Sequence, residues 1–372
     1  MAKYKLNDLC EFITDGTHQT PEYCNEEGVI FLSSKDVTER KINWDDVKYI
    51  PYSLHEKLYK RLSPRKDDIL LAKNGTTGVA AIVDKDEIFD VYVSLAVLRP
   101  LNRICPRYLL YAINSPVVKR QFDAGLKGIG VPNLHLGVIR ETVINVTDWG
   151  DQVKICEILD KIAAVVEKRK TELSELDGLI KARFVEMFGD PKINPFGWAV
   201  VNISEVVGGK VSNGFFAKRD DYVDDGNVSI LGVVNIVNRM YSKVDELPKT
   251  DVDDKDIEKF EVRYGDMLFC RSSLVAEGIG KASIIPENVQ GKVLFECHVI
   301  RLPLDLNKCV PEFMQTLSTT DFFRNQVIAQ SKTATMTTIG QDGILKTDII
   351  LPPVDKQREF YDFVKQVTKS KF

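Results

Sequence analysis

The chain has 372 residues, of which 44% are apolar and 28% are charged. This length and composition suit two globular domains, each with its own apolar core, and they exclude an intrinsically disordered chain. The formal net charge is −4, which counts against a uniformly basic nucleic-acid-binding protein, although basic residues can still gather on one face.

The cysteines and the apolar pattern indicate the cellular compartment of the protein. Seven cysteines are present, and no two are spaced as Cys-x-x-Cys. An odd number without paired spacing argues against a disulfide framework and against a zinc site. The chain contains no apolar run of about 18 residues and no apolar signal core near its start. We therefore expect a soluble protein of the reducing cytoplasm.

The first predicted domain, residues 1–150, is rich in β-type sequence. Residues 69–72, 79–83 and 91–98 have the length and the residue types of strands. One helix is predicted after them, over residues 106–124, because proline suits the first helical turn, where its missing N–H would have no partner anyway.

A long helix is predicted next, over residues 151–188, which contain no proline and one glycine. Its apolar residues recur at the spacing of a coiled-coil seam, so this side of the helix needs a partner helix. Gly189-Asp190-Pro191 ends the helix, with glycine after the last turn and proline beyond it. The residues expected to pair with another helix are Ile155, Ile158, Ile162, Val165, Leu173 and Leu176.

The second half of the chain has the same order of elements. After a segment that begins at residue 191, strands are predicted at 267–270, 281–285 and 298–302, and a helix over 311–329. A second long helix begins near Asp355 and reaches only about half the length of the first before the chain stops. Its expected pairing residues are Phe360, Phe363, Val364 and Val367.

Four segments of the first half are echoed in the second half in the same order. The matched pairs are 6–12 with 200–206, 68–73 with 266–271, 106–110 with 311–315, and the stretches that begin at Gln152 and Gln357. Their offsets drift only between 194 and 205, a period far too long for a solenoid repeat. The sequence therefore predicts two copies of one unit, each a β-rich domain followed by a long helix.

A search for catalytic motifs finds none that is complete. Asn194-Pro195-Phe196 lacks the second proline of an amino-methyltransferase loop, and residues 278–283 lack the first glycine of a phosphate-binding loop. No two of the four histidines lie within helical reach of each other, and residues 167–170 form a charged helix face rather than a nuclease motif. We therefore expect no catalytic residue and no bound metal.

This layout resembles the specificity subunit of type I restriction–modification enzymes. The residues that carry the resemblance are 351–360 at the start of the second long helix, 158–162 and 184–191 in the first, and 66–75 and 264–271 inside the two domains. Two departures stand out. Residues 145–150 replace the double proline that the family pattern has before its first helix, and the second helix is short.

The resemblance implies an α+β fold with two β-rich target-recognition domains, at 1–150 and 191–353. Each is followed by a spacer helix, at 151–190 and 354–372, and the two helices pack as an antiparallel coiled coil. Each domain would read one half of an asymmetric, bipartite double-stranded DNA site. Two methyltransferase subunits would bind the helices and supply the S-adenosylmethionine chemistry, and motor-nuclease subunits would join for cleavage, while this chain binds no cofactor.

Two loops in each domain are expected to contact DNA, because donors and acceptors read base edges and cations bind phosphates. One loop follows the strand at 69–72 or 267–270, and the other follows the short helix. A third loop, after Gly16 and after Gly214-Phe215-Phe216, adds polar residues. The predicted DNA-contacting residues are Thr17, His18, Gln19, Lys73, Asn74, Thr76, Thr77, Lys127, Asn133, His135, Lys218, Arg219, Arg271, Ser272, Ser273, Lys332, Thr335 and Thr337.

Three alternatives stay open at this point. Polar surface loops without any ligand would have the same composition as the predicted DNA-binding loops. A non-catalytic scaffold built from duplicated β-domains and a coiled coil would show the same repeats, and the dependence of DNA binding on salt would separate it from a DNA reader. A specificity subunit with a shortened second helix would assemble poorly with methyltransferase subunits. A stand-alone enzyme with fused methyltransferase and nuclease is disfavoured by the length and the missing motifs.

Overall fold

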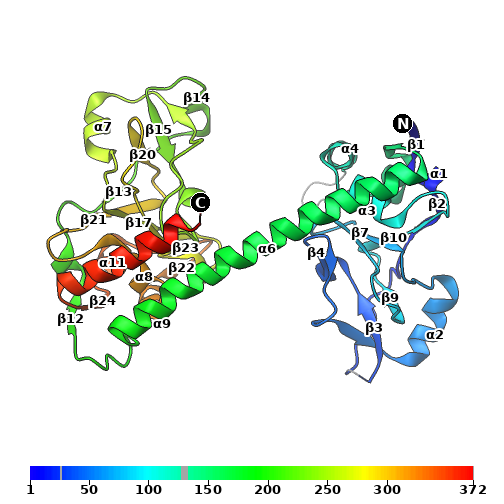
Figure 1. The fold of residues 1–372 in the computed structure, drawn as a ribbon, viewed down its shortest axis with the longest axis horizontal. Helices are drawn as coiled ribbons and strands as arrows, with labels where there is room; N and C mark the ends of the chain where they lie inside the picture. The colour runs from blue at the N-terminus through cyan, green and yellow to red at the C-terminus, as the bar shows by residue number, and fades with distance from the viewer. Residues whose placement is uncertain (26, 127–132, 372) are drawn as a thin grey trace. The chain divides into compact units, whose positions relative to one another are not determined.

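The computed structural model describes residues 1–25, 27–126 and 133–371, and the chain divides into two compact units, Met1–Lys168 and Arg169–Phe372. The long helix α6 (Trp149–Phe188) begins in unit 1 and ends in unit 2 (Figure 1). Each unit contains β-sheets and short helices, so the prediction of an α+β protein with two β-rich regions is confirmed. No helix of the described ranges is long and apolar enough to cross a membrane.

Unit 1 is built on a four-stranded antiparallel sheet with the order β2-β10-β7-β8. Its central strand β7 alternates between two apolar cores, with Ile69 and Leu71 in one cluster and Leu70 in the other. A sheet that is covered on both faces needs a continuous apolar run, and this strand has one. The strands of this sheet are β2 (Cys10–Asp15), β10 (Leu95–Pro100), β7 (Ile69–Ala72) and β8 (Ala80–Ile82).

Smaller elements complete unit 1. The strand β3 pairs in parallel with β9 and antiparallel with β6, β1 pairs with β11, and β4 pairs with β5. The elements are β1 (Ala2–Lys5), β3 (Val29–Leu32), β4 (Val37–Thr38), β5 (Lys41–Ile42), β6 (Lys48–Ile50), β9 (Phe89–Val91), β11 (Val143–Val146), α1 (Leu6–Leu9), α2 (Tyr52–Arg61), α3 (Pro106–Ile113), α4 (Pro116–Gly125), α5 (Leu136–Glu141) and the 3-10 turn η1 (Ser34–Asp36).

Unit 2 repeats this plan. Its main sheet has the order β13-β21-β17-β19, and β15 pairs in parallel with β20 as β3 does with β9. The central strand β17 again alternates between two cores, with Met267 and Phe269 in one and Leu268 in the other. The strands are β13 (Ser212–Asn213), β21 (Val299–Pro303), β17 (Asp266–Cys270), β19 (Ala282–Ile284), β15 (Val228–Leu231), β20 (Val293–Phe295), β14 (Tyr222–Val223), β16 (Lys249–Thr250), β12 (Ala199–Asn202), β24 (Asp348–Leu351), β18 (Ser272–Ser273), β22 (Lys332–Thr333) and β23 (Thr337–Thr338).

The helices of unit 2 stand at the places that the repeat predicts. The long α11 follows β24 as α6 follows β11. The elements are α7 (Asp254–Phe260), α8 (Pro311–Ser318), α9 (Asp321–Ala329), α10 (Gln341–Leu345), α11 (Val354–Lys369), η2 (Ile203–Val206), η3 (Arg219–Asp221), η4 (Val233–Asn235) and η5 (Ala276–Gly278).

Matching hydrogen bonds identify equivalent positions in the two units. The amide of Leu6 donates to Thr142 O at 2.9 Å, and the amide of Ile203 donates to Thr347 O at 3.0 Å. Leu6 therefore corresponds to Ile203, and the sequence match of residues 6–12 with 200–206 was wrong by three positions. The error arose because β1 and β12 are mostly polar or exposed, so the local identity that set the match was weak.

The structure also corrects two predicted elements. The strand expected at 91–98 is two strands, β9 and β10, because a turn at residues 92–94 separates them. The single helix expected at 106–124 is two helices, α3 and α4, and the side chain of Ser115 caps the second by accepting from Val118 N. The helix expected at 311–329 is divided in the same way, and Thr320 caps α9.

The two long helices are in contact within unit 2. Phe184 and Phe188 of α6 pack against Phe360 of α11, with ring centroids 5.7 Å apart in both pairs. Phe313 of α8 stacks on Phe184 at 5.6 Å and closes the aromatic cluster. All four rings are fully buried, so this cluster ties the second half of α6 to α11 and to the body of unit 2.

Candidate nucleic-acid interface

Two loops that are far apart in the sequence lie side by side in unit 1. One follows β7 and the other precedes α5. The amide of Leu134 in the second loop donates to the carbonyl of Lys73 in the first at 2.9 Å. This bond joins two of the segments that the sequence analysis selected, and it makes them one surface.

Unit 2 brings its equivalent loops together through the equivalent bond. The amide of Ile339 donates to the carbonyl of Arg271 at 3.0 Å. The contact then continues as a small sheet with the order β18-β23-β22, in which Ser272 pairs with Thr338 and Lys332 pairs with Thr338 from the other side. The same juxtaposition therefore occurs in both units, with a different local structure.

The loops of unit 1 present a mixture of free and occupied polar groups. Asn74 is half-buried and Thr76 is exposed, although the Thr76 hydroxyl donates to Val37 O at 3.1 Å. Thr77 is buried, with its hydroxyl 3.4 Å from the carbonyl of Lys73. His135 is exposed at the N-terminus of α5.

Lys73 has a structural partner in unit 1. Its side chain is buried, and Nζ donates to Asp15 Oδ2 at 2.5 Å. In this arrangement the ammonium group neutralises a buried carboxylate instead of facing the surface. We therefore no longer propose Lys73 as a DNA contact. The sequence could not distinguish a DNA-binding lysine from a lysine that neutralises a buried carboxylate, because a lysine directly after a strand suits both roles.

The remaining predicted residues of unit 1 lie near these loops or outside the described part of the chain. His18 and Gln19 are exposed, and Thr17 forms an isolated bridge with Tyr92. The side-chain oxygen of Asn133 is buried and has no partner within the described residues. Lys127 lies outside the described residues.

The loops of unit 2 are more open. Lys332 and Thr335 are exposed, while Ser272 and Ser273 are half-buried in β18. The guanidinium of Arg271 donates to Cys297 O at 3.1 Å. The predicted contact Thr337 is buried, with its hydroxyl 3.0 Å from that of Thr333. Of the polar residues predicted in these two loops, Lys332 and Thr335 are therefore the most accessible to a ligand.

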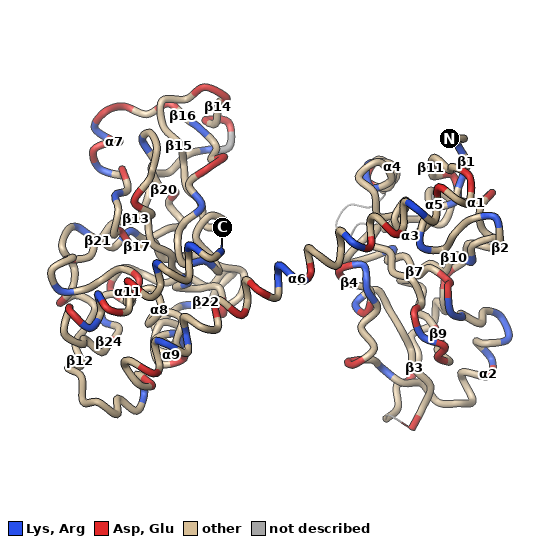
Figure 2. Tube along the Cα trace, viewed as in Figure 1, with Lys and Arg blue, Asp and Glu red and all other residues tan. Residues whose placement is uncertain are grey.

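Lys218 and Arg219 stand in an acidic part of unit 2. Red positions gather around α7 and β14 in Figure 2, and residues 220, 221, 224 and 225 are all aspartate. The backbone amide of Lys218 itself donates to Asp221 Oδ2 at 2.7 Å. Negative potential of this kind opposes a phosphate backbone, so we leave both residues out of the proposed interface.

The helix-pairing residues fall into two classes. Phe360, Val364 and Val367 of α11 are buried and Phe363 is half-buried, as are Leu173 and Leu176 of α6. The earlier part of the α6 seam is open, because Ile158, Ile162 and Val165 are 58%, 54% and 68% exposed. Ile155 is half-buried against the core of unit 1.

Two glutamines that the sequence marked only as helix starts have a defined structural role. The side chain of Gln152 accepts from Cys105 N at 2.8 Å and donates to Thr147 O at 2.9 Å. Gln357 repeats both bonds, to Val310 N and Pro352 O, at 2.8 Å each. Each glutamine therefore joins the start of a long helix to the start of α3 or α8.

The described residues offer no metal centre, because no three histidine, cysteine, aspartate or glutamate side chains are grouped to hold an ion. The cysteines are free thiols. Burial raises the pKa of Cys10 and of Cys309 to about 12, so these thiols stay protonated at neutral pH and are poor nucleophiles or ligands.

Sequence reasoning missed a group of cations in unit 2. Lys281, Arg239 and Arg324 line one pocket, and none was selected from the sequence. A direct comparison of the two copies contained a signal, because Lys281 stands where unit 1 has Val79. Both residues accept a backbone hydrogen bond from the end of the preceding central strand.

Residues 1–177 match a family model described as the type I restriction modification DNA specificity domain. No curated protein matches the chain significantly. Among solved structures, the S subunit of a type I restriction–modification system from M. genitalium is similar over 100% of this chain and 90% of its own, with a TM-score of 0.54 and 11% identity. This likeness shows a shared fold.

Two further structures are similar over the whole chain. One comes from a study of complex assembly and conformational transition in the type I R-M system, with a TM-score of 0.44, 15% identity, and coverage of 100% of this chain and 90% of that chain. The other is the HsdS subunit from Thermoanaerobacter tengcongensis, with a TM-score of 0.36, 16% identity, and coverage of 100% and 89%.

Proposed function

We propose that the chain is a type I restriction–modification specificity subunit, which reads a two-part, asymmetric DNA sequence and directs methyltransferase subunits to it. The match of residues 1–177 to the DNA specificity domain and the shared fold of an S subunit support this proposal. Specificity subunits are non-catalytic components of type I complexes, and this chain is therefore a subunit and not an enzyme by itself. The chemistry at the DNA would come from its partners.

The two recognition domains are assigned to residues 1–150 and 191–353, with the spacer helices at 151–190 and 354–372. The observation that carries the proposal is the paired loops. In both units the loop after the central strand and the loop after the short helices meet through one equivalent bond, Leu134 N to Lys73 O and Ile339 N to Arg271 O. Two copies of one surface suit two half-sites of different sequence.

Within these surfaces, the residues that we assign to DNA are the accessible ones. Base edges are read by side chains that reach a groove, so buried groups are set aside. In unit 1 these residues are His18, Gln19, Asn74, Thr76 and His135, together with Thr17 and Asn133; in unit 2 they are Arg271, Ser272, Ser273, Lys332 and Thr335. Lys127 lies outside the described residues and is assigned from the sequence alone.

The spacer helices are proposed to form an antiparallel pair that sets the distance between the half-sites, since half-site spacing is a geometric quantity. Contacts between the helices support this direction because they come in reverse chain order, as Arg169 with Lys371, Arg183 with Phe363, and Phe188 with Phe360. The exposed seam residues Ile158, Ile162 and Val165 are proposed to receive helices of methyltransferase subunits, which would carry S-adenosylmethionine. We place the complex in the cytoplasm, with motor-nuclease subunits as further partners.

Methylome sequencing tests the proposal. The chain is expressed together with a type I methyltransferase subunit from the same host, and modified adenines are mapped in host DNA. We expect one bipartite motif. The double substitution Asn74→Ala and Thr76→Ala should weaken the base preference in one half of the motif. Lys332→Ala with Thr335→Ala should weaken the base preference in the other half.

Lys255→Ala on α7 is the matched control, because Lys255 is exposed and lies outside both loops. It should leave the motif unchanged. A stable complex that modifies no motif would reject the proposal, and so would relaxation of the same half by both double substitutions.

A further inference from the structure

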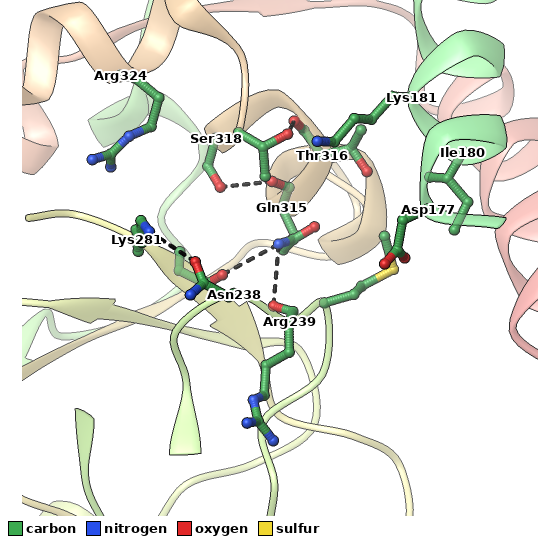
Figure 3. Close-up of a pocket in the computed structure, with 13 residues that line it drawn as sticks. Asp177, Ile180, Lys181, Asn238, Arg239, Lys281, Gln315, Thr316, Ser318 and Arg324 are labelled. Carbon is green, nitrogen blue, oxygen red and sulfur yellow. Dashed lines mark hydrogen bonds between the residues drawn. The ribbon is translucent and has the colours of Figure 1, made fainter. Parts of the chain in front are cut away.

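A pocket of about 350 Å³ lies in unit 2, where α6, the turn at residues 238–240, β19 and α8 meet (Figure 3). Four cationic side chains are among the residues that line it, and Asp177 is the one carboxylate among them. The four cations are Lys181, Arg239, Lys281 and Arg324. This concentration stands out in a chain whose formal net charge is −4.

The pocket cations have no carboxylate partners among the described residues. Lys281 Nζ donates to the neutral Asn238 Oδ1 at 2.7 Å. One amino group of Arg324 donates to Glu277 O at 3.0 Å, and its other amino group is buried without a partner in the described chain. Asp177, the lining carboxylate, is held by Lys371. The pocket therefore carries positive charge that the protein does not neutralise.

Partial burial disfavours the charged form of Arg324. Desolvation lowers the pKa of this guanidinium below its usual value, which means that its charge is held in a poorly hydrated place. A buried cation without a counter-charge is unfavourable unless an anion completes the site. An external anion would relieve that cost.

The equivalent region of unit 1 shows the opposite arrangement. Lys119 corresponds to Arg324, because each donates to a carbonyl of the loop after the central strand, Lys119 Nζ to Thr77 O at 2.9 Å. Lys119 also lies 3.2 Å from Asp123. At the position of Asp123, α9 carries Ile328, so the neutralising carboxylate is absent from unit 2.

The turn at residues 238–240 also has a counterpart in unit 1. Asn238 and Glu39 both have positive φ, 58° and 48°, and each turn is closed by an equivalent backbone bond, Lys243 N to Asn235 O and Asn43 N to Asp36 O. In unit 1 this turn leads to Lys41, whose Nζ lies 3.8 Å from Glu167. Lys119 and Lys41 of unit 1 thus have carboxylates within 4 Å, whereas the four pocket cations of unit 2 have none among the described residues.

The pocket adjoins the recognition loops of unit 2. Lys281 O accepts from Cys270 N at 2.8 Å, and Cys270 directly precedes Arg271. Glu277, which holds Arg324, belongs to η5 in the same hairpin, between β18 and β19. A duplex placed over β18 and β22 would therefore bring its sugar–phosphate backbone to these cations.

We propose that this pocket binds a phosphate group of the DNA backbone and so orients the duplex on the recognition loops of unit 2. The proposal rests on the proposed function and adds a residue set to it. Arginine and lysine are the side chains that bind phosphate, and phosphate contacts set the register of a protein on DNA without reading its sequence. Unit 1 would lack this clamp.

Salt dependence tests the proposal with the full-length chain and a short duplex of random sequence. The double variant Arg239→Gln, Lys281→Gln removes two pocket cations but keeps the Arg324–Glu277 bond. The slope of log K against log salt should become shallower by about 0.9 for each phosphate that the variant no longer neutralises. Arg239→Lys with Lys281→Arg keeps both charges and should keep the slope.

The control removes two charges elsewhere. Lys249 and Lys255 are exposed on β16 and α7, and Lys249→Gln with Lys255→Gln should leave the slope unchanged. If the wild-type chain binds the duplex and the pocket variant has the wild-type slope, or the control changes the slope as much, the phosphate proposal is overturned. Loss of methyltransferase binding by the pocket variant with an unchanged slope would assign the pocket to a protein partner and also overturn it.

A different result separates this proposal from the proposed function. If the wild-type chain binds no duplex, DNA reading itself fails. Calorimetry with pyrophosphate then examines the pocket alone. Binding that the pocket variant loses would indicate a free phosphorylated ligand, and absence of binding would leave no anion site; both results would overturn the DNA-backbone assignment.

Discussion

The starts of α6 and α11 occupy equivalent positions in the two units, yet their apolar residues have different surroundings. Gln152 and Gln357 mark the equivalence, because each accepts a backbone amide at 2.8 Å. Counted from these glutamines, Ile162 corresponds to Val367. Ile162 is 54% exposed, whereas Val367 is 6% exposed. The same apolar pattern is thus satisfied within the chain in unit 2 and left open in unit 1.

This difference shows that an apolar seam pattern indicates that a helix packs against a partner but does not identify that partner. The second half of α6 and α8 cover Phe360 within unit 2. Among the described residues, Ile158 and Ile162 have no such cover. The open seam is therefore the part of the helix that we assign to partner subunits, and the covered seam is the part that stabilises the fold.

The largest expected effect concerns the covered seam. Phe360→Ala should lower the free energy of unfolding of unit 2 by about 3–5 kcal/mol, because it opens a cavity among three other buried rings. Denaturant unfolding measures this in a variant with Trp44 and Trp149 replaced by phenylalanine. Trp198, which donates to Phe188 O at 3.0 Å, then reports on this cluster.

Ile155→Ala is the matched control for Phe360→Ala, since Ile155 is the equivalent residue of unit 1 and is only half-buried. Followed through Trp44 in a variant with Trp149 and Trp198 replaced by phenylalanine, Ile155→Ala should lower the free energy of unfolding of unit 1 by clearly less. Equal losses of unfolding free energy at the two positions would show that the two helix starts are buried to the same extent. That result would contradict the difference between the two units.

A pairing of charges has also diverged between the two copies. Arg99 binds Asp68 with two hydrogen bonds of 2.9 and 2.8 Å in unit 1. In unit 2 the strand register places Pro303 at the position of Arg99, because Leu98 faces Ile69 and Leu302 faces Met267. The nearby Arg301 donates to the carbonyls of Lys259 and Glu261, and Asp266 has no ion pair among the described residues. Burial raises the pKa of Asp266 above its usual value.

Asp68→Asn should therefore destabilise unit 1 by about 3–5 kcal/mol, because it leaves a buried arginine unpaired. Asp266→Asn should leave the stability of unit 2 unchanged or raise it, since asparagine still accepts from Arg263 N and removes a buried charge. Thermal unfolding of both variants measures the contrast. A loss of the same size at both positions would contradict it.

Glu312 gives a smaller effect that depends on pH. Desolvation raises the pKa of this carboxyl group above its usual value, although Tyr241 donates to it at 3.0 Å. The folded state then holds the proton to a higher pH than the unfolded chain does, so stability falls as pH rises above about 4.5 through the raised pKa.

Glu312→Gln removes this titration and should flatten the pH dependence of unfolding of unit 2, with a gain in stability at neutral pH. Unfolding followed by Trp198 between about pH 4 and 7 tests it. Unit 1, followed through Trp44, serves as the internal control and should respond equally to pH in both proteins. An unchanged slope in the variant would show that Glu312 is ionised in the folded state throughout this range.

The smallest effect on the fold is expected at the open seam. Ile162→Ala should change the unfolding free energy by less than about 0.5 kcal/mol, because the side chain has little cover to lose. The same change should weaken binding of the methyltransferase subunit, which a pull-down or calorimetry measures. A large loss of stability without a loss of binding would place this face inside the fold.

Much of the fold could be predicted from the sequence because it depends on local patterns. The long apolar period of 151–188 and the Gly189–Pro191 stop predicted α6 to within two residues of its observed start. The run Ile69–Ala72 predicted β7, since a strand buried on both faces needs an uninterrupted apolar run. The division into α3 and α4 was missed because Pro116 suits a first helical turn as well as a loop.

The candidate site was less predictable, because it depends on which side chains meet. Lys73 and Lys332 both follow strands or helices in polar loops, yet one neutralises Asp15 and the other is exposed. The cations of the unit 2 pocket come from four separated segments, so no local motif contains them.

By itself, the sequence determined the duplication, the sheet strands and the two long helices, because apolar periodicity and helix stop signals act within a few residues of the chain. Only the tertiary structure decided which half of the seam is covered, which lysines and arginines are neutralised, and which pocket is left with unpaired cations. These outcomes follow from contacts between residues far apart in sequence, where burial sets the free-energy cost of an uncovered apolar group or an unpaired charge.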